Sequence, residues 1–248
     1  MDALIIAAGF GSRLRDISDS KPMAPVAGVP LLELGVRQAK AAGAARVVVV
    51  TGHEAERLEA ALPALAARTG IAVEPARVDD WAKPNGWSVI AGAERIGGDY
   101  LLMMSDHIFS APILTGLARQ GGADRGVTLA VDRRIDDPLI DPDDATWVER
   151  MPNGFIRAIG KAITTFDAVD CGAFLCTPEL AGAIRGAIAA GQPGSLSEGM
   201  QRLADAGRAA TWEIGGAWWL DVDDPRAHQL AEAQAPQHLA EVYAAALS

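Results

Sequence analysis

The sequence predicts an α/β protein built on a doubly wound, mostly parallel central sheet. Two short runs, Leu4–Ala8 and Arg46–Thr51, have the continuous hydrophobicity of strands that are buried on both faces. Between them, Leu31–Ala42 carries apolar residues at helical spacing, and Gly43 follows as a C-cap. Strand, helix and strand make a βαβ unit, and sheets of this kind bind ligands beyond the carboxyl ends of their strands.

The same alternation continues along the chain. It predicts a helix, a strand, a helix and a strand, in that order, over Glu54–Leu62, Ala72–Val78, Ser88–Arg95 and Tyr100–Met104. Further on, Gly126–Asp132 resembles a strand, and residues 136–165 contain the Pro, Asp and Asn-Gly turn signals of hairpins that cover a site. The alanine-rich stretch Asp224–Leu247 predicts a closing helix.

Length and composition favour one soluble domain spanning residues 1–248. Half of the 248 residues are hydrophobic, which is enough for a full core. Without a run of about 18 apolar residues or a basic leader, we expect a cytoplasmic protein with no stable membrane insertion. The net charge of −10 argues against a nucleic-acid partner. Cys171 and Cys176 are too few for a disulfide framework and are expected in the core.

A glycine-rich turn follows the first strand in the segment AAGFGSRL. Backbone N–H groups in such a turn can face a phosphate chain. The turn is no P-loop, because no Gly-Lys-Ser/Thr follows, and Leu14 occupies the third-glycine position of a dinucleotide-binding fingerprint. The candidate nucleotide-binding residues of this turn are Ala7, Ala8, Gly9, Gly11 and Ser12.

Two cations accompany this turn, Arg13 within it and Lys21 eight residues later. Nucleotidyl transfer needs cations around the triphosphate more than it needs covalent help, so both are candidate catalytic residues. The alternative is that they are surface residues flanking an ordinary turn. Of the six tryptophans, Trp87 and Trp218 are the candidates for a pocket wall.

Carboxylates stand at the ends of two further apolar strands. Asp106 follows Tyr100–Met104, and Asp221 and Asp223 close the segment WWLDVD. Magnesium prefers a few carboxylate oxygens together with phosphate and water, so these strand ends predict a metal site. Alternatively, Asp106 and Asp223 only cap the helices that follow. A lone histidine beside an aspartate is typically a positioning residue, which is the role we expect for His107.

These motifs together resemble the sugar-nucleotide pyrophosphorylase type of nucleotidyltransferase, and within it the CTP:inositol-1-phosphate cytidylyltransferases. The resemblance rests on LIIAAGFGSRL, Lys21-Pro22, the Asn-Gly-aromatic-Ser turn at residues 85–88, SDHIFS, the Ile-Gly-Lys and Asp-x-Gly motifs of residues 159–174, and WWLDVDDP. It implies a Rossmann-like nucleotidyltransferase fold with a small β-hairpin lid, roughly residues 133–170, that binds the acceptor. Ser105 and Cys171 depart from the family pattern, which leaves the substrate contacts open.

The resemblance also implies roles for individual residues. Ala8, Gly9, Asn85, Gly86 and Ser88 would hold the cytidine, with the pyrimidine against the backbone at Gly86. Asp106 and Asp221 would bind Mg²⁺, whereas Asp223 stays open as a direct ligand. Lys161 would grip the acceptor phosphate, which brings two anions together and is a form of positioning catalysis. The remaining candidate substrate-binding residues are His107, Asp170 and Gly172.

The expected reaction joins CMP from CTP to a phosphorylated alcohol, and inositol 1-phosphate is the expected acceptor. The sequence leaves open phosphocholine, a phosphonate or a sugar 1-phosphate as acceptor, and UTP or dTTP as donor. A catalytically idle nucleotide-binding regulatory module is the alternative from another class. The resemblance implies a downstream CDP-alcohol phosphotransferase, expected as a separate protein because this chain ends at Ser248. A homodimer is compatible with this interpretation.

Overall fold

The computed structural model describes residues 1–246 and has four parallel strands at its centre. In spatial order these are β5 (Ala72–Arg77), β4 (Arg46–Thr51), β1 (Asp2–Ile6) and β6 (Tyr100–Met104). β1 lies between β4 and β6, and all three are buried along nearly their whole length. This burial explains why the sequence of these strands is apolar without alternation.

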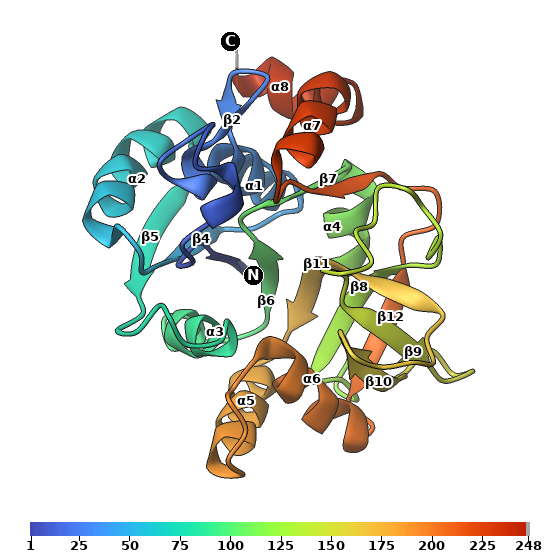
Figure 1. The fold of residues 1–248 in the computed structure, drawn as a ribbon. Coiled ribbons are helices and arrows are strands. Elements are labelled where there is room, and N and C mark those ends of the chain that lie inside the picture. The colour runs from blue at the N-terminus through green and yellow to red at the C-terminus, as the bar shows by residue number, and fades with distance from the viewer. Residues whose placement is uncertain (247–248) are drawn as a thin grey trace.

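The sheet continues beyond β6 with mostly antiparallel pairs (Figure 1). β11 (Ala168–Cys176) runs antiparallel to β6 and also pairs with β8 (Val127–Asp132), which is parallel to β12 (Ala209–Glu213). A hairpin of β9 (Trp147–Arg150) and β10 (Ile156–Gly160) extends from β11. The sheet is therefore mixed, with its parallel half on the N-terminal side.

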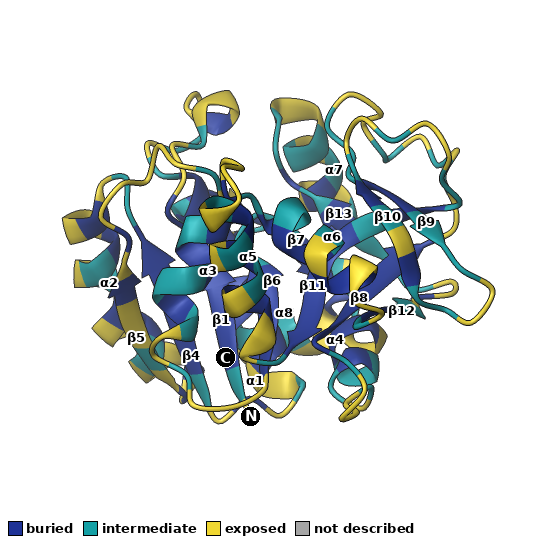
Figure 2. Ribbon diagram, turned by 90° about the horizontal axis from the view of Figure 1, so that it is seen from below, coloured by how far each residue is buried: buried dark blue, intermediate teal, exposed yellow. Residues whose placement is uncertain are grey.

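Helices cover both faces of this sheet, so that the buried strands lie between helical layers (Figure 2). Leu4 and Ile6 of β1 point into one core, whereas Ala3 and Ile5 point into the other, as alternate residues of a strand must. The first core is closed by α3 (Gly86–Ala93), α5 (Glu179–Ala189) and α6 (Leu196–Asp205). The second is closed by α1 (Leu31–Ala41), α2 (Ala55–Thr69) and α4 (Ala111–Leu117).

A third, smaller core joins the segment after β1 to the end of the chain. Leu14, β2 (Pro25–Val26) and β3 (Val29–Pro30) pack with α7 (Pro225–His238) and α8 (Ala240–Ala246). Two short strands, β7 (His107–Phe109) and β13 (Trp219–Asp221), pair antiparallel beside it. The two 3₁₀ turns, Ser12–Leu14 and Lys21–Met23, complete the described elements.

The predicted α/β fold with a mostly parallel central sheet is confirmed, with shifts at element ends, and β9 and β10 form a hairpin within the segment predicted as a lid. The first strand ends at Ile6 rather than Ala8, so Ala7 and Ala8 already belong to the turn. The second helix continues to Thr69 with Pro63 inside it, well past Leu62. The closing helix is two helices, α7 and α8, and its predicted last residue, Leu247, lies outside the described residues. Cys171 and Cys176 are free and buried, as expected.

Candidate active site

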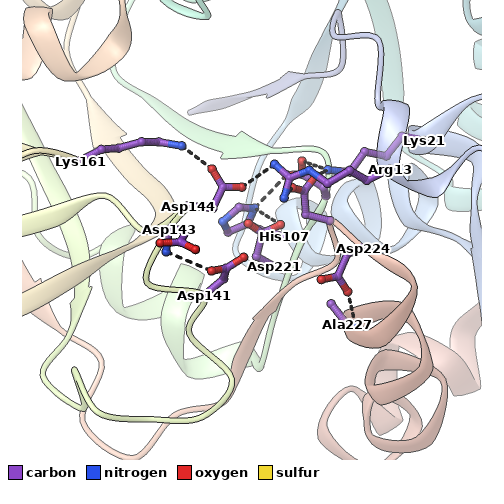
Figure 3. Close-up of polar contacts among 12 residues, drawn as sticks. Arg13, Lys21, His107, Asp141, Asp143, Asp144, Lys161, Asp221, Asp224 and Ala227 are labelled. Atoms are coloured by element: carbon purple, nitrogen blue, oxygen red, sulfur yellow. Dashed lines mark hydrogen bonds and ion pairs between the residues drawn. The ribbon is translucent and has the colours of Figure 1, made fainter.

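Four strand ends bring the candidate residues together. Ser105, at the end of β6, donates its backbone N–H to the carbonyl of Ile6, at the end of β1 (3.1 Å). Val222 donates to the carbonyl of Asp106 (2.9 Å), and the β7–β13 register sets His107 opposite Asp221. Side chains that are more than 100 positions apart in the sequence therefore converge at one edge of the sheet (Figure 3).

Lys21 is the buried cation of this cluster. Its side chain is 9% exposed, and its Nζ lies 2.6 Å from Asp106 Oδ2 and also contacts Asp223. Burial alone would lower the pKa of Lys21, but the carboxylates of Asp106, Asp221 and Asp223 outweigh it and raise that pKa. Lys21 is therefore a fixed positive charge and no surface residue, which removes the alternative drawn from the sequence for this lysine.

The environment of His107 favours the protonated form of its imidazole. Burial would lower the pKa of its imidazole, but Asp221 and Asp106 together raise that pKa to about 9. Its Nδ1 lies 2.8 Å from Asp106 Oδ1 and 3.6 Å from Asp221 Oδ1. The contact of Nδ1 with Asp106 fixes the orientation of the ring, so the geometry favours the expected positioning role.

Asp106 and Asp221 have the donor atoms that a hard divalent cation needs. With His107 they form a group whose ligand atoms lie within 4.8 Å of one another. Asp221 Oδ1 is buried and accepts no hydrogen bond from residues 1–246, an arrangement that is costly unless a further group completes it. Burial and the neighbouring carboxylates of Asp106 and Asp223 raise the pKa of Asp221 to about 6. A bound cation would relieve this repulsion.

The alternative role considered from the sequence, that Asp106 and Asp223 only cap helices, is wrong. Asp106 precedes the strand β7 and not a helix. The cap of α7 is Asp224, whose side chain accepts the backbone N–H of Ala227 at 2.7 Å. Both carboxylates are thus free to face Lys21, as the ion pairs above require.

The glycine turn lines a cavity of about 310 Å³ together with Lys21 and Asp106. All five candidate residues of the turn lie in its wall, as do Asn85 and Ser88. Gly11 has φ +59°, and an added Cβ would lie 2.4 Å from Lys21 Cβ, so only glycine lets the lysine pack beneath the turn. We refer to this space as the turn cavity.

Gly86 does not line the turn cavity, contrary to the expectation of a pyrimidine against its backbone. A Cβ at Gly86 would lie 2.3 Å from the carbonyl oxygen of Gly194 and 2.9 Å from Ile184 Cγ2. The glycine therefore serves the packing of α3 on α5, and a substitution there would test packing rather than base recognition. Trp87 and Trp218, the candidates for a pocket wall, line neither the turn cavity nor the neighbouring cavity between residues 133–170 and α7. Trp81 lines the turn cavity and Trp219 lines the neighbouring one.

A second cavity, of about 420 Å³, opens between the lid and α7. We call it the lid cavity. The sequence candidates in its wall are Arg13, Asn85, His107, Lys161, Asp170, Gly172, Asp221 and Asp223. Burial raises the pKa of Asp170 to about 6, and its Oδ1 accepts the backbone N–H of Gly172 at 2.7 Å. The two cavities share Arg13, Asn85, Met104 and Asp223 as lining residues, so they meet at the centre of the cluster.

One carboxylate of the lid, Asp144, lies between the two cations that face this junction. Arg13 Nη2 is 2.8 Å from Asp144 Oδ2, and Lys161 also contacts the same carboxylate. The other end of the Arg13 guanidinium lies 2.6 Å from Asp223. Figure 3 shows Lys161, Asp144 and Arg13 in a row. Sequence reasoning missed Asp144, because the turn-rich segment around it carries no periodic pattern.

Gly172→Ala should destabilise the fold by about 2–4 kcal/mol, measured by chemical denaturation. Gly172 has φ +75°, and an added Cβ would lie 2.4 Å from Cδ2 of His107. Gly182→Ala, on a helix with no atom within 4 Å of the new methyl group, is the matched control and should be neutral or stabilising. Equal stability of the two variants would contradict this placement of the His107 ring.

The fold and the site together define a nucleotide-handling α/β domain, and comparison with known proteins agrees. Residues 3–161 match the profile of the MobA-like NTP transferase domain. The chain belongs to this family. The resemblance to nucleotidyltransferases predicted from the motifs is thereby confirmed.

Individual relatives are similar over most of this chain. A bifunctional IPC transferase and DIPP synthase of Rubrobacter xylanophilus is 35% identical over 234 residues, covering 93% of this chain and 51% of that protein. The protein of the same name from Aquifex aeolicus is 29% identical over 225 residues, covering 90% and 49%. The chain thus spans about half the length of these relatives.

The solved structure of the inositol-1-phosphate CTP transferase from T. maritima has the same fold. It superposes with a TM-score of 0.82 at 21% identity, covering 95% of this chain and 96% of that chain. Among residues 1–246, no helix combines the length and the apolar character needed to cross a membrane.

Proposed function

We propose that this protein transfers CMP from CTP to inositol 1-phosphate, giving a CDP-alcohol and pyrophosphate. The observation that carries the proposal is a row of alternating charges across the junction of the two cavities, Lys21, Asp223, Arg13, Asp144 and Lys161. Such a row offers cations to two separate anionic substrates on either side of one metal-binding pair. The name of the T. maritima protein, an inositol-1-phosphate CTP transferase, supports CTP and inositol 1-phosphate as those substrates.

In this proposal the turn cavity takes the triphosphate and the lid cavity takes the acceptor. Backbone N–H groups of the turn, Arg13 and Lys21 neutralise the β- and γ-phosphates. Lys161, Asp170, His107 and the backbone at Gly172 hold the acceptor under the lid, residues 133–170. The single domain of residues 1–248 with an inserted lid is part of the same proposal.

Asp106 and Asp221 would hold Mg²⁺, and the unpartnered Oδ1 of Asp221 supports this assignment. The bound ion would supply charge stabilisation for the leaving pyrophosphate. Asp223 already contacts both Lys21 and Arg13, so its first role is to fix these cations.

The chemistry requires no general base. An oxygen of the acceptor phosphate attacks the α-phosphorus of CTP, a new P–O bond forms, and the bond from the α-phosphorus to the oxygen that bridges to the β-phosphate breaks. The attacking oxygen carries no proton that must be removed, because one phosphate oxygen is ionised at neutral pH. This agrees with a site in which the imidazole of His107 is held by the carboxylate of Asp106. Positioning and charge stabilisation remain as the tasks of the protein.

Asp144→Asn should lower the KM for the acceptor by about two- to fivefold, because the acceptor phosphate then no longer displaces a carboxylate from Lys161 and Arg13. Steady-state kinetics at saturating CTP measure this change. Asp143→Asn removes the same charge from an exposed neighbour outside the cavity wall and should leave KM unchanged. A higher KM for Asp144→Asn would mean that Asp144 contacts the acceptor instead.

A panel of the four NTPs against several phosphorylated alcohols, scored by pyrophosphate release, tests the proposed function. We expect CTP with inositol 1-phosphate to give the highest kcat/KM and EDTA to abolish the reaction. Phosphocholine, a phosphonate or a sugar 1-phosphate as the preferred acceptor, or UTP or dTTP as the preferred donor, would keep the enzyme class and change the substrate. Binding of CTP without turnover of any pair would favour the regulatory module.

The proposed substrates also suggest the setting of the reaction. CTP is a cytoplasmic metabolite, so we propose a cytoplasmic site of action. A CDP-alcohol is an activated donor, and a CDP-alcohol phosphotransferase is the class of enzyme that consumes it. The names of the bifunctional relatives pair an IPC transferase with a DIPP synthase, which supports this order of reactions.

A further inference from the structure

Two large hydrophobic side chains are exposed side by side near the mouth of the turn cavity. Phe10 is 41% and Trp81 is 42% exposed, and among residues 1–246 the only other large hydrophobic side chain so exposed is Met1. Phe10 lies in the glycine turn itself, between Gly9 and Gly11, and Trp81 lines the turn cavity. An exposed apolar pair that adjoins a binding cavity is typical of a surface that a ligand covers.

The two rings are held in place before any ligand binds. Their planes are within 16° of parallel with centroids 6.2 Å apart, and the ring of His53 packs edge-on against both, at 4.8 Å and 4.9 Å. The Arg15 guanidinium lies 4.3 Å above the centre of the Phe10 ring and 3.1 Å from His53 Nε2. A contact surface that is already ordered loses little conformational entropy on binding.

The backbone around Trp81 is shaped to bring it against the first strand end. A Cβ at Gly52 would lie 2.6 Å from Trp81 Cβ and 2.9 Å from both the Cβ and the carbonyl oxygen of Ala8. Only a glycine at position 52 therefore lets the loop that carries Trp81 pack on the turn. The aromatic side chain is thus a built wall of the cavity.

The charges of the turn cavity indicate which part of a nucleotide meets this wall. The fixed cation Lys21 and the carboxylates of Asp106 and Asp223 form the part of the wall where the triphosphate and the metal must lie. The uncharged, planar part of a nucleoside triphosphate is its base, and stacking on an aromatic face suits any base.

We infer that the indole face of Trp81 stacks on the nucleobase, with the Phe10–His53–Arg15 cluster fixing the indole. This inference rests on the proposed function and specifies how its donor is held. Stacking contributes affinity for the base without selecting among bases. Selection among the four NTPs then depends on groups that contact the edge of the base, and Asn85 and Ser88, which also line the turn cavity, are candidates for this role.

Trp81→Ala and Trp81→Phe, compared in their binding of CTP and of inorganic tripolyphosphate by calorimetry with Mg²⁺, test the inference. Trp81→Ala should weaken CTP binding by about tenfold or more, and Trp81→Phe should recover most of the loss. Tripolyphosphate, which has no base, should bind all three proteins alike. Equal losses for both ligands, or unchanged CTP binding in Trp81→Ala, would overturn the inference.

Tryptophan fluorescence gives a second measurement that does not depend on the alanine variant. CTP should quench the emission of the unaltered protein and of Trp218→Phe, whose indole packs on His238 away from both cavities, but not of Trp81→Phe. Quenching that persists in Trp81→Phe would contradict stacking on Trp81. If the unaltered protein bound tripolyphosphate and CTP equally weakly, the proposed function would fail together with the inference.

Discussion

Asp221→Asn should lower kcat for pyrophosphate release by about 1,000-fold or more at saturating Mg²⁺, CTP and inositol 1-phosphate. The substitution keeps the shape of the side chain but removes its negative charge, including that on Oδ1, which accepts no hydrogen bond from residues 1–246. The loss of a metal ligand commonly removes several kcal/mol of transition-state stabilisation, and each 1.36 kcal/mol is about tenfold in rate.

The stability of the same variant separates a metal ligand from a structural residue. The Oδ1 of Asp221 is buried near Asp106 and Asp223, and it accepts no hydrogen bond from residues 1–246. Removing its charge relieves repulsion, so the melting temperature should stay the same or rise. Asp143→Asn, which removes an exposed charge nearby, should leave both rate and stability unchanged. Near-normal turnover of Asp221→Asn would remove this residue from the metal site.

Lys161→Ala should reduce kcat/KM for inositol 1-phosphate by about 100-fold and leave CTP affinity nearly unchanged. Lys161 reaches the lid cavity from the loop after β10, and its only charged contact within residues 1–246 is Asp144. In the proposed complex, the acceptor phosphate replaces that carboxylate and must approach a triphosphate that repels it. Acceptor kinetics at saturating CTP, together with calorimetry of CTP binding, measure the two quantities separately.

Arg157→Ala is the matched control for Lys161→Ala. Arg157 lies on the same hairpin, its side chain is 59% exposed like that of Lys161, and its charged partner is Glu149 outside the cavity wall. Its substitution should change neither acceptor kinetics nor CTP affinity. Equal losses in both measurements for Lys161→Ala would assign Lys161 to the nucleotide, and no loss in either would make it a solvated surface lysine.

The central strands could be predicted because burial on both faces requires a continuous run of apolar residues. The run RVVVVT has one interpretation in a chain of this kind, and β4 has the predicted bounds. The three-residue strand β7 has no such signal, because a strand of that length has no measurable period. β13 lies in the apolar segment WWLDVD, but nothing in that segment indicates that it pairs with β7. Their register sets His107 opposite Asp221, so this part of the site became visible only in the folded chain.

The candidate site could be predicted where it depends on strand ends. Arg13 and Lys21 belong to the segment after β1 and Asp106 follows β6, and the parallel pairing of β1 and β6 brings these strand ends to one edge. Asp221 and Asp223 stand at the end of the apolar segment WWLDVD, and the antiparallel pair of β7 and β13 brings them to the same place. Asp144 and Trp81 lie on loops without any hydrophobic pattern, and their positions depend on tertiary contacts. Gly86 illustrates the opposite error, because a glycine required by helix packing has the same signature as one beside a ligand.

The proposed reaction depends on attack by an oxygen of the acceptor phosphate on the α-phosphorus of CTP. The most direct measurement is ³¹P NMR and mass spectrometry of a reaction containing CTP, Mg²⁺ and inositol 1-phosphate whose phosphate oxygens carry ¹⁸O. We expect all of the label to appear in a CDP-alcohol with a new diphosphate bridge, and none in the released pyrophosphate. A labelled acceptor recovered unchanged beside CMP, or the release of unlabelled inorganic phosphate with CDP, would contradict nucleotidyl transfer by this site.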